Sequence, residues 1–379
     1  MKQTSRIIST YSADVFGVCS ALFELGGMTI MHDASGCNST YTTHDEPRWY
    51  DMESMVYISG LSEMEAIMGD DEKLIGDIVA AAEDLHPRFI AVAGTPIPAM
   101  TGFDYEAVAA VIEERTGIPA FGFPTTGMNT YIHGASMALA GIAQRFVDRD
   151  AVKTAEKSVN VLGLTPLDFS VSGADQSVVR FLESNGWRVL SRWAMGSTLE
   201  EMAAAGSAHV NLVVSASGLG AAKALQQIFG TPYVVGLPIG PMAHKVAQAL
   251  DTAAESGEDQ FPASCLSEGD TVIIGEGITS VSLASAMELE TGKGVRVICP
   301  TECDAALLRS KDQHLQYEED IAAALEGAKL VIADPLFRPI CPEGIRFAEL
   351  PTEAFSGRIY REHIPNLVSC FSEFLREVL

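Results

Sequence analysis

The sequence lacks the short motifs that identify many nucleotide-binding and hydrolytic enzymes. It contains no GxxxxGK[ST] pattern and therefore no P-loop. It also contains no GxSxG nucleophile elbow and no HExxH zinc motif. If ATP drives the chemistry of this chain, another protein has to hydrolyse it.

Positive charge is also scarce. The 379 residues include 25 lysines and arginines against 50 aspartates and glutamates, which gives a formal net charge of −25 at pH 7. Such an acidic chain needs a local basic patch to bind nucleic acid, and the sequence contains none, so we expect no nucleic-acid partner. The acidity fits a basic protein partner, and it also fits plain solubility.

Long apolar runs are missing. No stretch approaches the roughly 20 apolar residues of a membrane-spanning helix. Lys2 and Arg6 are not followed by the apolar segment of a signal peptide. We therefore expect no membrane association and a cytoplasmic location. Hydrophobic residues make up 47% of the chain, which is enough for full cores, and the length predicts two or three domains.

Cysteine is infrequent, odd in number and scattered, which argues against a disulfide framework. Cys19 and Cys37 both lie in glycine-rich surroundings near the start of the chain, an arrangement that suits a metal cluster at the end of a sheet. Cys299 and Cys303 form a CxxxC pair after a predicted strand. Without a second pair nearby, this spacing favours buried thiols over a metal site. The seven cysteines are Cys19, Cys37, Cys265, Cys299, Cys303, Cys341 and Cys370.

The sequence does contain a repeat of short β-branched runs, glycine-rich turns and alanine-rich helical stretches. Apolar runs that alternate with helices predict parallel sheets covered on both faces. Ligands of such folds bind at the carboxyl ends of the strands. The predicted strands are Phe89–Ala93, Val159–Gly163, Asn211–Ser215, Thr271–Gly275, Val295–Cys299 and Leu330–Ala333.

We therefore predict an α/β protein of three Rossmann-like domains, each a mostly parallel sheet flanked by helices. The expected domains are residues 1–150, which carry the cluster cysteines, then residues 151–262 and residues 263–379. The last domain is expected to end in an amphipathic helix within residues 364–379. Its apolar face comprises Leu367, Cys370, Phe371, Phe374 and Leu375.

Two glycine pairs follow predicted strands, Gly218 with Gly220 and Gly275 with Gly277. Both lack the third glycine of a dinucleotide-binding fingerprint. They therefore favour tight strand-to-helix turns over a nucleotide site.

Candidate substrate-contacting residues lie at strand ends and in the polar, aromatic segment after Cys37. A histidine suits proton delivery because its unperturbed pKa is about 6.5. Each candidate also fits an ordinary loop residue. The candidates for proton delivery or carboxylate binding are His32, His44, Asp45 and Arg48. Further candidates for the wall of a third-domain pocket are Cys265, Arg338 and Cys341.

Several segments resemble the nitrogenase component 1 type oxidoreductases. Cys19, in a predicted helical turn, is similar to the family's first cluster cysteine, and residues 32–37 resemble the segment that ends in the second. The resemblance covers nearly the whole chain and extends to dark-operative protochlorophyllide reductases, the reductive cyclase of coenzyme F430 synthesis and the proteins that mature the nitrogenase cofactor. Other similar segments are 62–74, 93–98, 186–189, 208–213 and 229–233.

The resemblance implies a redox protein that accepts electrons from a nitrogenase reductase-like ATPase. The electrons would pass through an interfacial iron–sulfur cluster to a small molecule or a tetrapyrrole. The resemblance implies Cys19 and Cys37 as metal ligands, with Gly36 and Thr95 next to the cofactor. Dinitrogen reduction is not expected, because the molybdenum-cofactor ligands of the nitrogen-fixing members cannot be placed in this sequence.

Thr95 stands where the family has a third cluster cysteine, so one chain supplies only half of a site. A homodimer would bring together two copies each of Cys19 and Cys37, and four thiolates suffice for one [4Fe–4S] cluster. Thr95 would then hydrogen-bond a cluster sulfide or cap the following turn. A heterodimer with a related chain would instead supply the missing thiol from its partner.

Three alternatives stay open. The chain could be a non-catalytic scaffold or carrier for a metal cluster or tetrapyrrole. It could be a binding protein that kept the three α/β units and lost redox function. It could also be a member that has lost its cluster, with Cys19 and Cys37 as buried thiols.

Overall fold

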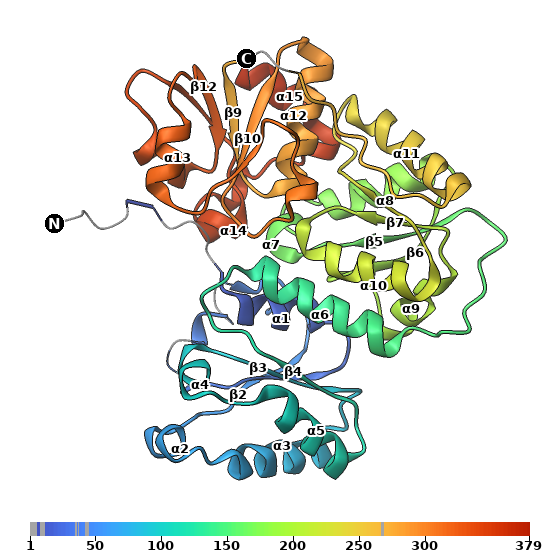
Figure 1. The fold of residues 1–379 in the computed structure, drawn as a ribbon, viewed down its shortest axis with the longest axis vertical. Helices are drawn as coiled ribbons and strands as arrows, with labels where there is room; N and C mark the ends of the chain where they lie inside the picture. The colour runs from blue at the N-terminus through green and yellow to red at the C-terminus, as the bar shows by residue number, and fades with distance from the viewer. Residues whose placement is uncertain (1–5, 8–11, 35, 37, 42–44, 267–268) are drawn as a thin grey trace.

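Three parallel sheets, each flanked by helices, make up the computed structural model (Figure 1). The structure describes residues 6–7, 12–34, 36, 38–41, 45–266 and 269–379. In Figure 1 the first sheet lies at the bottom, the second at the right and the third at the top. The predicted α/β class with three mostly parallel sheets is confirmed.

The first sheet has the strand order β2-β1-β3-β4, and every pairing is parallel. Helices α3 and α5 pack against one another on one face of this sheet, and α1 and α6 cover the other (Figure 1). The strands are β1 (Met28–Met31), β2 (Met55–Ile58), β3 (Ile90–Ala93) and β4 (Ala120–Phe123). The helices are α1 (Asp14–Leu22), α2 (Glu63–Met68), α3 (Asp71–Leu85), α4 (Pro96–Thr101), α5 (Tyr105–Thr116) and α6 (Tyr131–Phe146).

The second sheet repeats this topology with the order β6-β5-β7-β8, again parallel throughout. Its strands are β5 (Ser158–Leu162), β6 (Arg188–Trp193), β7 (Val210–Val213) and β8 (Tyr233–Val235). Its α-helices are α7 (Pro166–Phe169), α8 (Ala174–Ser184), α9 (Leu199–Ala203), α10 (Leu219–Phe229) and α11 (Met242–Ser256). Two short 3-10 helices are η2 (Ala204–Ser207) and η3 (Ala216–Gly218).

The third sheet has five parallel strands in the order β11-β10-β9-β12-β13. They are β9 (Thr271–Ile274), β10 (Val295–Cys299), β11 (Gln313–His314), β12 (Leu330–Ala333) and β13 (Arg346–Glu349). The α-helices are α12 (Gly277–Thr291), α13 (Glu318–Ala324), α14 (Glu353–Ser356) and α15 (Leu367–Val378). The 3-10 helices are η4 (Ala305–Leu307), η5 (Pro335–Ile340) and η6 (Gly357–His363).

The predicted strands are present because their apolar runs can be buried on both faces. Strands β3, β5, β7 and β12 are buried along their whole length. The predicted boundaries at 150/151 and 262/263 fall in connections between sheets and remain predictions. Among the residues that the structure describes, no helix is long and apolar enough to cross a membrane.

The closing helix α15 packs against α8, so the end of the chain returns to the second sheet's layer. Its predicted apolar face is buried at Leu367, Phe371, Phe374 and Leu375. The prediction was wrong for Cys370, which is exposed. The helical path is broken at this residue, with φ −118° and ψ 24°, so the ideal helical period does not hold there.

Helix α6 joins the first two layers because glycines let neighbouring helices approach it closely (Figure 1). A methyl group on Gly17 of α1 would lie 2.0 Å from the Tyr131 carbonyl oxygen, and one on Gly134 of α6 would lie 1.8 Å from the Asp14 carbonyl oxygen. On the second layer, a methyl on Gly220 of α10 would lie 2.7 Å from Ser136 Oγ. Only residues without a side chain permit these backbone contacts.

The α1–α6 crossing predicts that Gly134→Ala strongly destabilises the protein. The added methyl overlaps backbone, and overpacking costs about 1–3 kcal/mol or more, against a gain of about 1 kcal/mol in helix propensity. Gly76→Ala is the matched control, because Gly76 lies in α3 with nothing within 4 Å of the added methyl. The melting temperature followed by circular dichroism should fall for Gly134→Ala and hold or rise for Gly76→Ala. Equal melting temperatures would contradict the crossing.

Candidate functional site

The carboxyl ends of β1 and β3 are tied together at the edge of the first sheet. His32 N–H donates to the Ala93 carbonyl at 2.9 Å, and Thr95 Oγ1 donates to the His32 carbonyl at 2.8 Å. The Thr95 hydroxyl does not cap α4, although Thr95 is the residue that precedes it. Thr95 therefore joins two strand ends, in the position where the family resemblance predicts a residue near the cofactor.

His32 is buried at this edge and is held as a neutral ring. Its Nδ1 lies 2.9 Å from Ser59 Oγ, and its ring centroid lies 4.5 Å from that of Phe103. Burial lowers the pKa of His32 to about 4, although the charges of Asp33 and Glu65 oppose this shift. The ring lines a cavity of about 570 Å³ and can exchange a hydrogen bond there, but it does not store a proton at neutral pH.

Cys19 lies on the buried face of α1 and is fully enclosed. Burial and the neighbouring Glu46 charge raise the pKa of its thiol far above the ordinary value. Cys37 and His44 lie outside the described residues, whereas Gly36 is exposed. Within the described ranges there is no group of three His, Cys, Asp or Glu side chains that could hold a metal ion. The described part of a single chain therefore does not fit a cluster by itself.

Arg48 is the centre of a buried polar network. All five of its N–H groups are used: they donate to both Glu46 carboxylate oxygens, to Glu24, and to the carbonyls of Ser20 and Ala194. Glu46 is fully buried. Arg48 was predicted to contact a substrate, but no donor is left for a substrate carboxylate. It joins the first layer to the second instead, because Ala194 follows β6.

The second-layer end of this network is strained. Ala194 has φ +86°, a conformation that an L side chain rarely adopts. The Arg48 guanidinium donates to its carbonyl at 3.1 Å, and Glu24 accepts from Gly196 N–H at 2.6 Å. Glu24 and Arg48 together hold the turn after β6 against α1.

Arg48→Met should therefore reduce stability rather than substrate affinity. It leaves Glu46 and Glu24 without their cation, and breaking a buried ion pair costs about 3–5 kcal/mol. Urea unfolding measures the loss, and adding Glu46→Gln should recover part of it. An Arg48→Met protein with wild-type stability would show that the network does not hold the layers together.

Asp45 fits the predicted role in proton delivery. Burial raises its pKa to about 7, while a hydrogen bond from Thr40 and the charge of Arg358 oppose the rise. A carboxyl group with this pKa both gives and takes a proton at neutral pH. Arg358 belongs to η6, so Asp45 lies where the first layer meets the third.

Three carboxylates close the seams at which the layers meet. Asp168 accepts the Tyr131 hydroxyl at 2.7 Å and 2.8 Å, which joins the first layer to the second. Glu276 caps α12 and accepts the Ala216 N–H at 2.9 Å, which joins the second to the third. Glu302 accepts both the N–H and the hydroxyl of Thr130, which joins the third to the first. Sequence reasoning did not select these three acids; their one signal is that each follows a predicted strand.

Two of these acids are close enough to influence one another. Burial raises the pKa of Asp168 to about 7, and the Glu276 charge adds to the rise. Burial also raises the pKa of Glu276, against the hydrogen bonds that it accepts from backbone N–H groups. The junction therefore holds a proton on this pair more readily than isolated carboxylates would.

Asp168 gives a signed pH dependence. In the unfolded chain an aspartate has a pKa of about 3.9, so between about pH 4 and pH 7 the unfolded state loses a proton that the folded state keeps. This stabilisation is complete below about pH 4 and falls by at most about 1.4 kcal/mol per pH unit up to about pH 7. Asp168→Asn removes it, so the stability of the wild type relative to this variant should be larger at about pH 5 than at about pH 8. Urea unfolding at both pH values tests this, and an equal difference would contradict the raised pKa.

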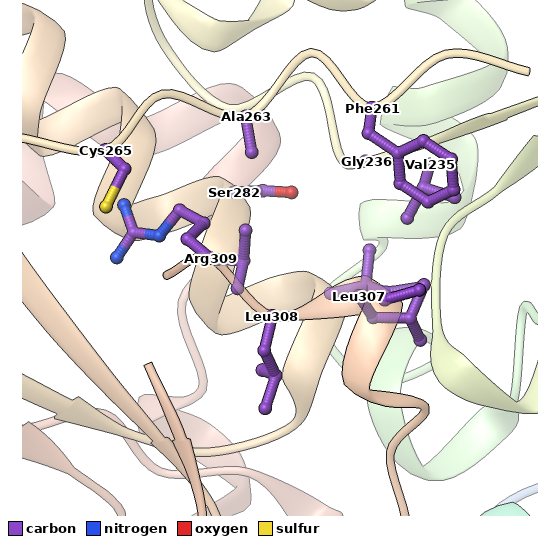
Figure 2. A pocket seen from close by; sticks show the side chains of 12 residues that line it. Val235, Gly236, Phe261, Ala263, Cys265, Ser282, Leu307, Leu308 and Arg309 are labelled. Atoms are coloured by element: carbon purple, nitrogen blue, oxygen red, sulfur yellow. The ribbon is translucent and has the colours of Figure 1, made fainter. Parts of the chain in front are cut away.

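A further cavity of about 230 Å³ lies between the second and third sheets. In Figure 2 the Cys265 thiol and the Arg309 side chain stand at one end, with Phe261 and Val235 at the other. Cys265 was predicted to line such a pocket, and it does. The other two residues predicted there are engaged elsewhere: Arg338 pairs with Glu349, and Cys341 Sγ donates to the Phe337 carbonyl.

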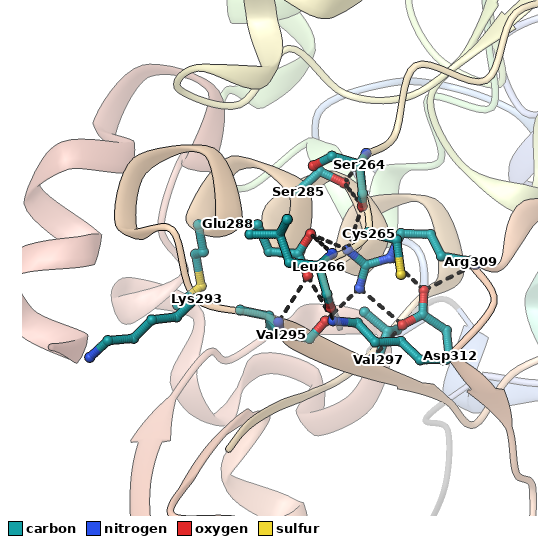
Figure 3. A network of polar contacts seen from close by, with 12 residues as sticks. Ser264, Cys265, Leu266, Ser285, Glu288, Lys293, Val295, Val297, Arg309 and Asp312 are labelled. Carbon is teal, nitrogen blue, oxygen red and sulfur yellow. Dashed lines mark hydrogen bonds and ion pairs between the residues drawn. The ribbon is translucent and has the colours of Figure 1, made fainter. Parts of the chain in front are cut away.

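Arg309 has no free charge to offer the cavity, because its guanidinium is tied into a network (Figure 3). It donates to Asp312 at 2.7 Å and 2.9 Å, to the Ser264 carbonyl at 2.8 Å and to the Val295 carbonyl at 2.6 Å. Glu288 accepts from Val295 N–H at 2.9 Å. The network fastens the segment before β9 to the third sheet and leaves an apolar cavity wall.

Comparison with known proteins decides the family. The family model described as Nitrogenase component 1 type Oxidoreductase matches residues 15–264. The chain belongs to this family. The match includes both N-terminal cysteines, all of the first sheet and all of the second.

Named relatives are more distant. The nitrogenase iron-molybdenum cofactor biosynthesis protein NifE of Rippkaea orientalis is 26% identical over 280 residues, which is 72% of this chain and 57% of that protein. One of the proteins of the light-independent protochlorophyllide reductase of Prosthecochloris aestuarii is 28% identical over 199 residues, 49% of this chain and 36% of that one. The match thus spans at most a little over half of these relatives.

The fold itself extends over the whole chain. A solved structure titled "Nitrogenase Cp1 at pH 6.5" superposes with a TM-score of 0.71 over 100% of this chain and 94% of that one, at 16% identity. This likeness concerns the architecture alone. It includes the third sheet, which the family model does not reach.

Proposed function

We propose that this chain is a component 1 type redox protein that accepts electrons from a partner iron–sulfur reductase and uses them to reduce a small molecule or a tetrapyrrole. Membership of the family, over residues 15–264, is the observation that carries this proposal. The sequence has no P-loop, so ATP hydrolysis would belong to the reductase partner.

The cofactor of this proposal is a [4Fe–4S] cluster shared by two chains, which would supply one-electron chemistry. Cys19 and Cys37 of each chain would provide the four thiolates, with Gly36 and Thr95 nearby. The buried Cys19 thiol sets a condition, because it has to become accessible to iron when two chains associate. A heterodimer with a related chain that brings an extra thiol is the variant of this arrangement.

The surface at the carboxyl edge of the first sheet supports pairing there. Helices α2 and α4 and the turn before α6 all follow strands of this sheet and lie at this edge. They expose large apolar side chains, which marks an association surface rather than a solvent face. These side chains are Met64, Ile67, Met68, Ile97, Met100 and Met128.

Anaerobic purification followed by iron and acid-labile sulfide analysis tests the cluster. We expect close to one [4Fe–4S] cluster per two chains in the wild type, and loss of iron in Cys37→Ala and in Cys19→Ala. Cys370→Ala is the matched control and should keep its iron, because Cys370 is exposed on the last helix. Iron retained in Cys37→Ala, or a colourless iron-free wild type, would overturn the cluster.

Substrate contacts would come from Asp45 and His32, with His44 as a further candidate. Asp45 would deliver protons near neutral pH because its pKa is raised to about 7. Cavity size bears on the substrate: ligand sites are typically about 300–1,000 Å³. The apolar cavity of about 230 Å³ suits only a small molecule, whereas the His32 cavity of about 570 Å³ falls in the range for larger ones.

A second candidate function is a non-catalytic carrier for a metal cluster or tetrapyrrole. It is favoured by the match to NifE, which is named as a cofactor biosynthesis protein. Turnover with a reductase, MgATP and dithionite supports the redox protein. A stoichiometric ligand that passes to an acceptor protein without turnover supports the carrier.

A further inference from the structure

Two cysteines outside the proposed cluster site lie next to one another in the third layer. Cys299 is the last residue of β10 and is buried, and Cys303 follows after one turn and is partly exposed. Their thiols are within hydrogen-bonding reach of each other. The CxxxC spacing thus brings the two sulfurs together at the carboxyl end of a parallel strand.

Both sulfurs rest on the same glycine at the beginning of α12. A methyl group on Gly277 would lie 2.7 Å from Cys303 Sγ and 3.6 Å from Cys299 Sγ. The hydrogen of Gly277 in place of a side chain is what leaves room for two sulfur atoms. This second observation is independent of the sequence spacing.

The two thiols differ in access. Cys303 lines a cavity of about 310 Å³ to which all three layers contribute, with His133 of α6 and Lys223 of α10 in its wall. Cys299 does not line this cavity and is fully buried. One reachable sulfur with a second sulfur behind it is the arrangement in which an attacked thiol is resolved by its neighbour.

We propose that Cys299 and Cys303 are a redox-active dithiol that closes to an internal disulfide on exposure to a small-molecule disulfide. Cys303 attacks the oxidant, so that a mixed disulfide forms and one thiol leaves. Cys299 then attacks Cys303 Sγ and releases the second thiol. Two electrons pass from the dithiol to the oxidant, and the two cysteine protons end on the two released thiols.

The reaction would be slow at neutral pH. The Cys299 thiol and burial raise the pKa of Cys303, and Glu276 and Asp304 oppose its ionisation further. The thiolate is the attacking form, so a mildly alkaline buffer is the right condition for the experiment.

The position of the pair gives the disulfide a structural consequence. Glu302 lies in the turn between the two cysteines, and it holds Thr130 N–H at 2.9 Å across the seam between the third and first layers. Asp304, on the other side of Cys303, pairs with Lys223 of α10 at 2.7 Å. The disulfide would therefore form inside the turn that joins all three layers, and this role goes beyond electron transfer by the proposed cluster.

Anaerobic treatment of the intact protein with oxidised glutathione, followed by alkylation and peptide mapping, tests the proposal. We expect a peptide pair linked through Cys299 and Cys303 that a thiol reductant reopens. Cys299→Ser should instead accumulate a mixed disulfide with glutathione on Cys303. The proposal is overturned if Cys299 stays reduced in the wild type after the exposed Cys265 and Cys370 have reacted.

A glycine variant tests the geometry with both thiols retained. The methyl of Gly277→Ala displaces Cys303 Sγ, so ring closure should be slower by about tenfold, whereas Gly76→Ala in α3 should close at the wild-type rate. Circular dichroism confirms that both variants are folded. Closure of Gly277→Ala at the wild-type rate would remove the structural basis of the pair.

Discussion

The close crossing of α1 and α6 is the constraint on which the other contacts depend. Glycine at positions 17 and 134 brings the two backbones together, and Asp14 then reaches the loop before α6. Its carboxylate accepts the N–H groups of Gly127 at 2.7 Å and Thr126 at 3.1 Å. That loop ends at Thr130 and Tyr131, so the crossing also positions the two residues that meet the other layers.

Hydrogen-bonded carboxylates, rather than apolar contacts alone, close the junction between the layers. Asp168, Glu276 and Glu302 each accept from a different layer, and the Arg48 network joins the first layer to the second. Part of the acidity of this chain is therefore structural and internal. Contacts of this kind respond to protonation and to small shifts of a turn, which suits a site that lies between layers.

Much of the architecture could be predicted, because strand burial leaves a local record. Apolar runs such as Ile90–Ala93 and Leu330–Ala333 are buried on both faces and are readable without their neighbours. The placement of His32 and Asp45 beside strand ends followed from the same pattern. The role of Arg48 did not, because its partners Glu24 and Ala194 lie far from it in the sequence.

The sequence by itself determined the parallel α/β class, the strand positions and the resemblance to a family, since these depend on periodicity and local motifs. Tertiary structure alone decided the protonation of the candidate residues. Burial makes His32 neutral, raises the pKa of Asp45 to about 7 and encloses Cys19. Desolvation and charge pairing depend on which distant residues are packed around a group, and that information is absent from the neighbouring sequence.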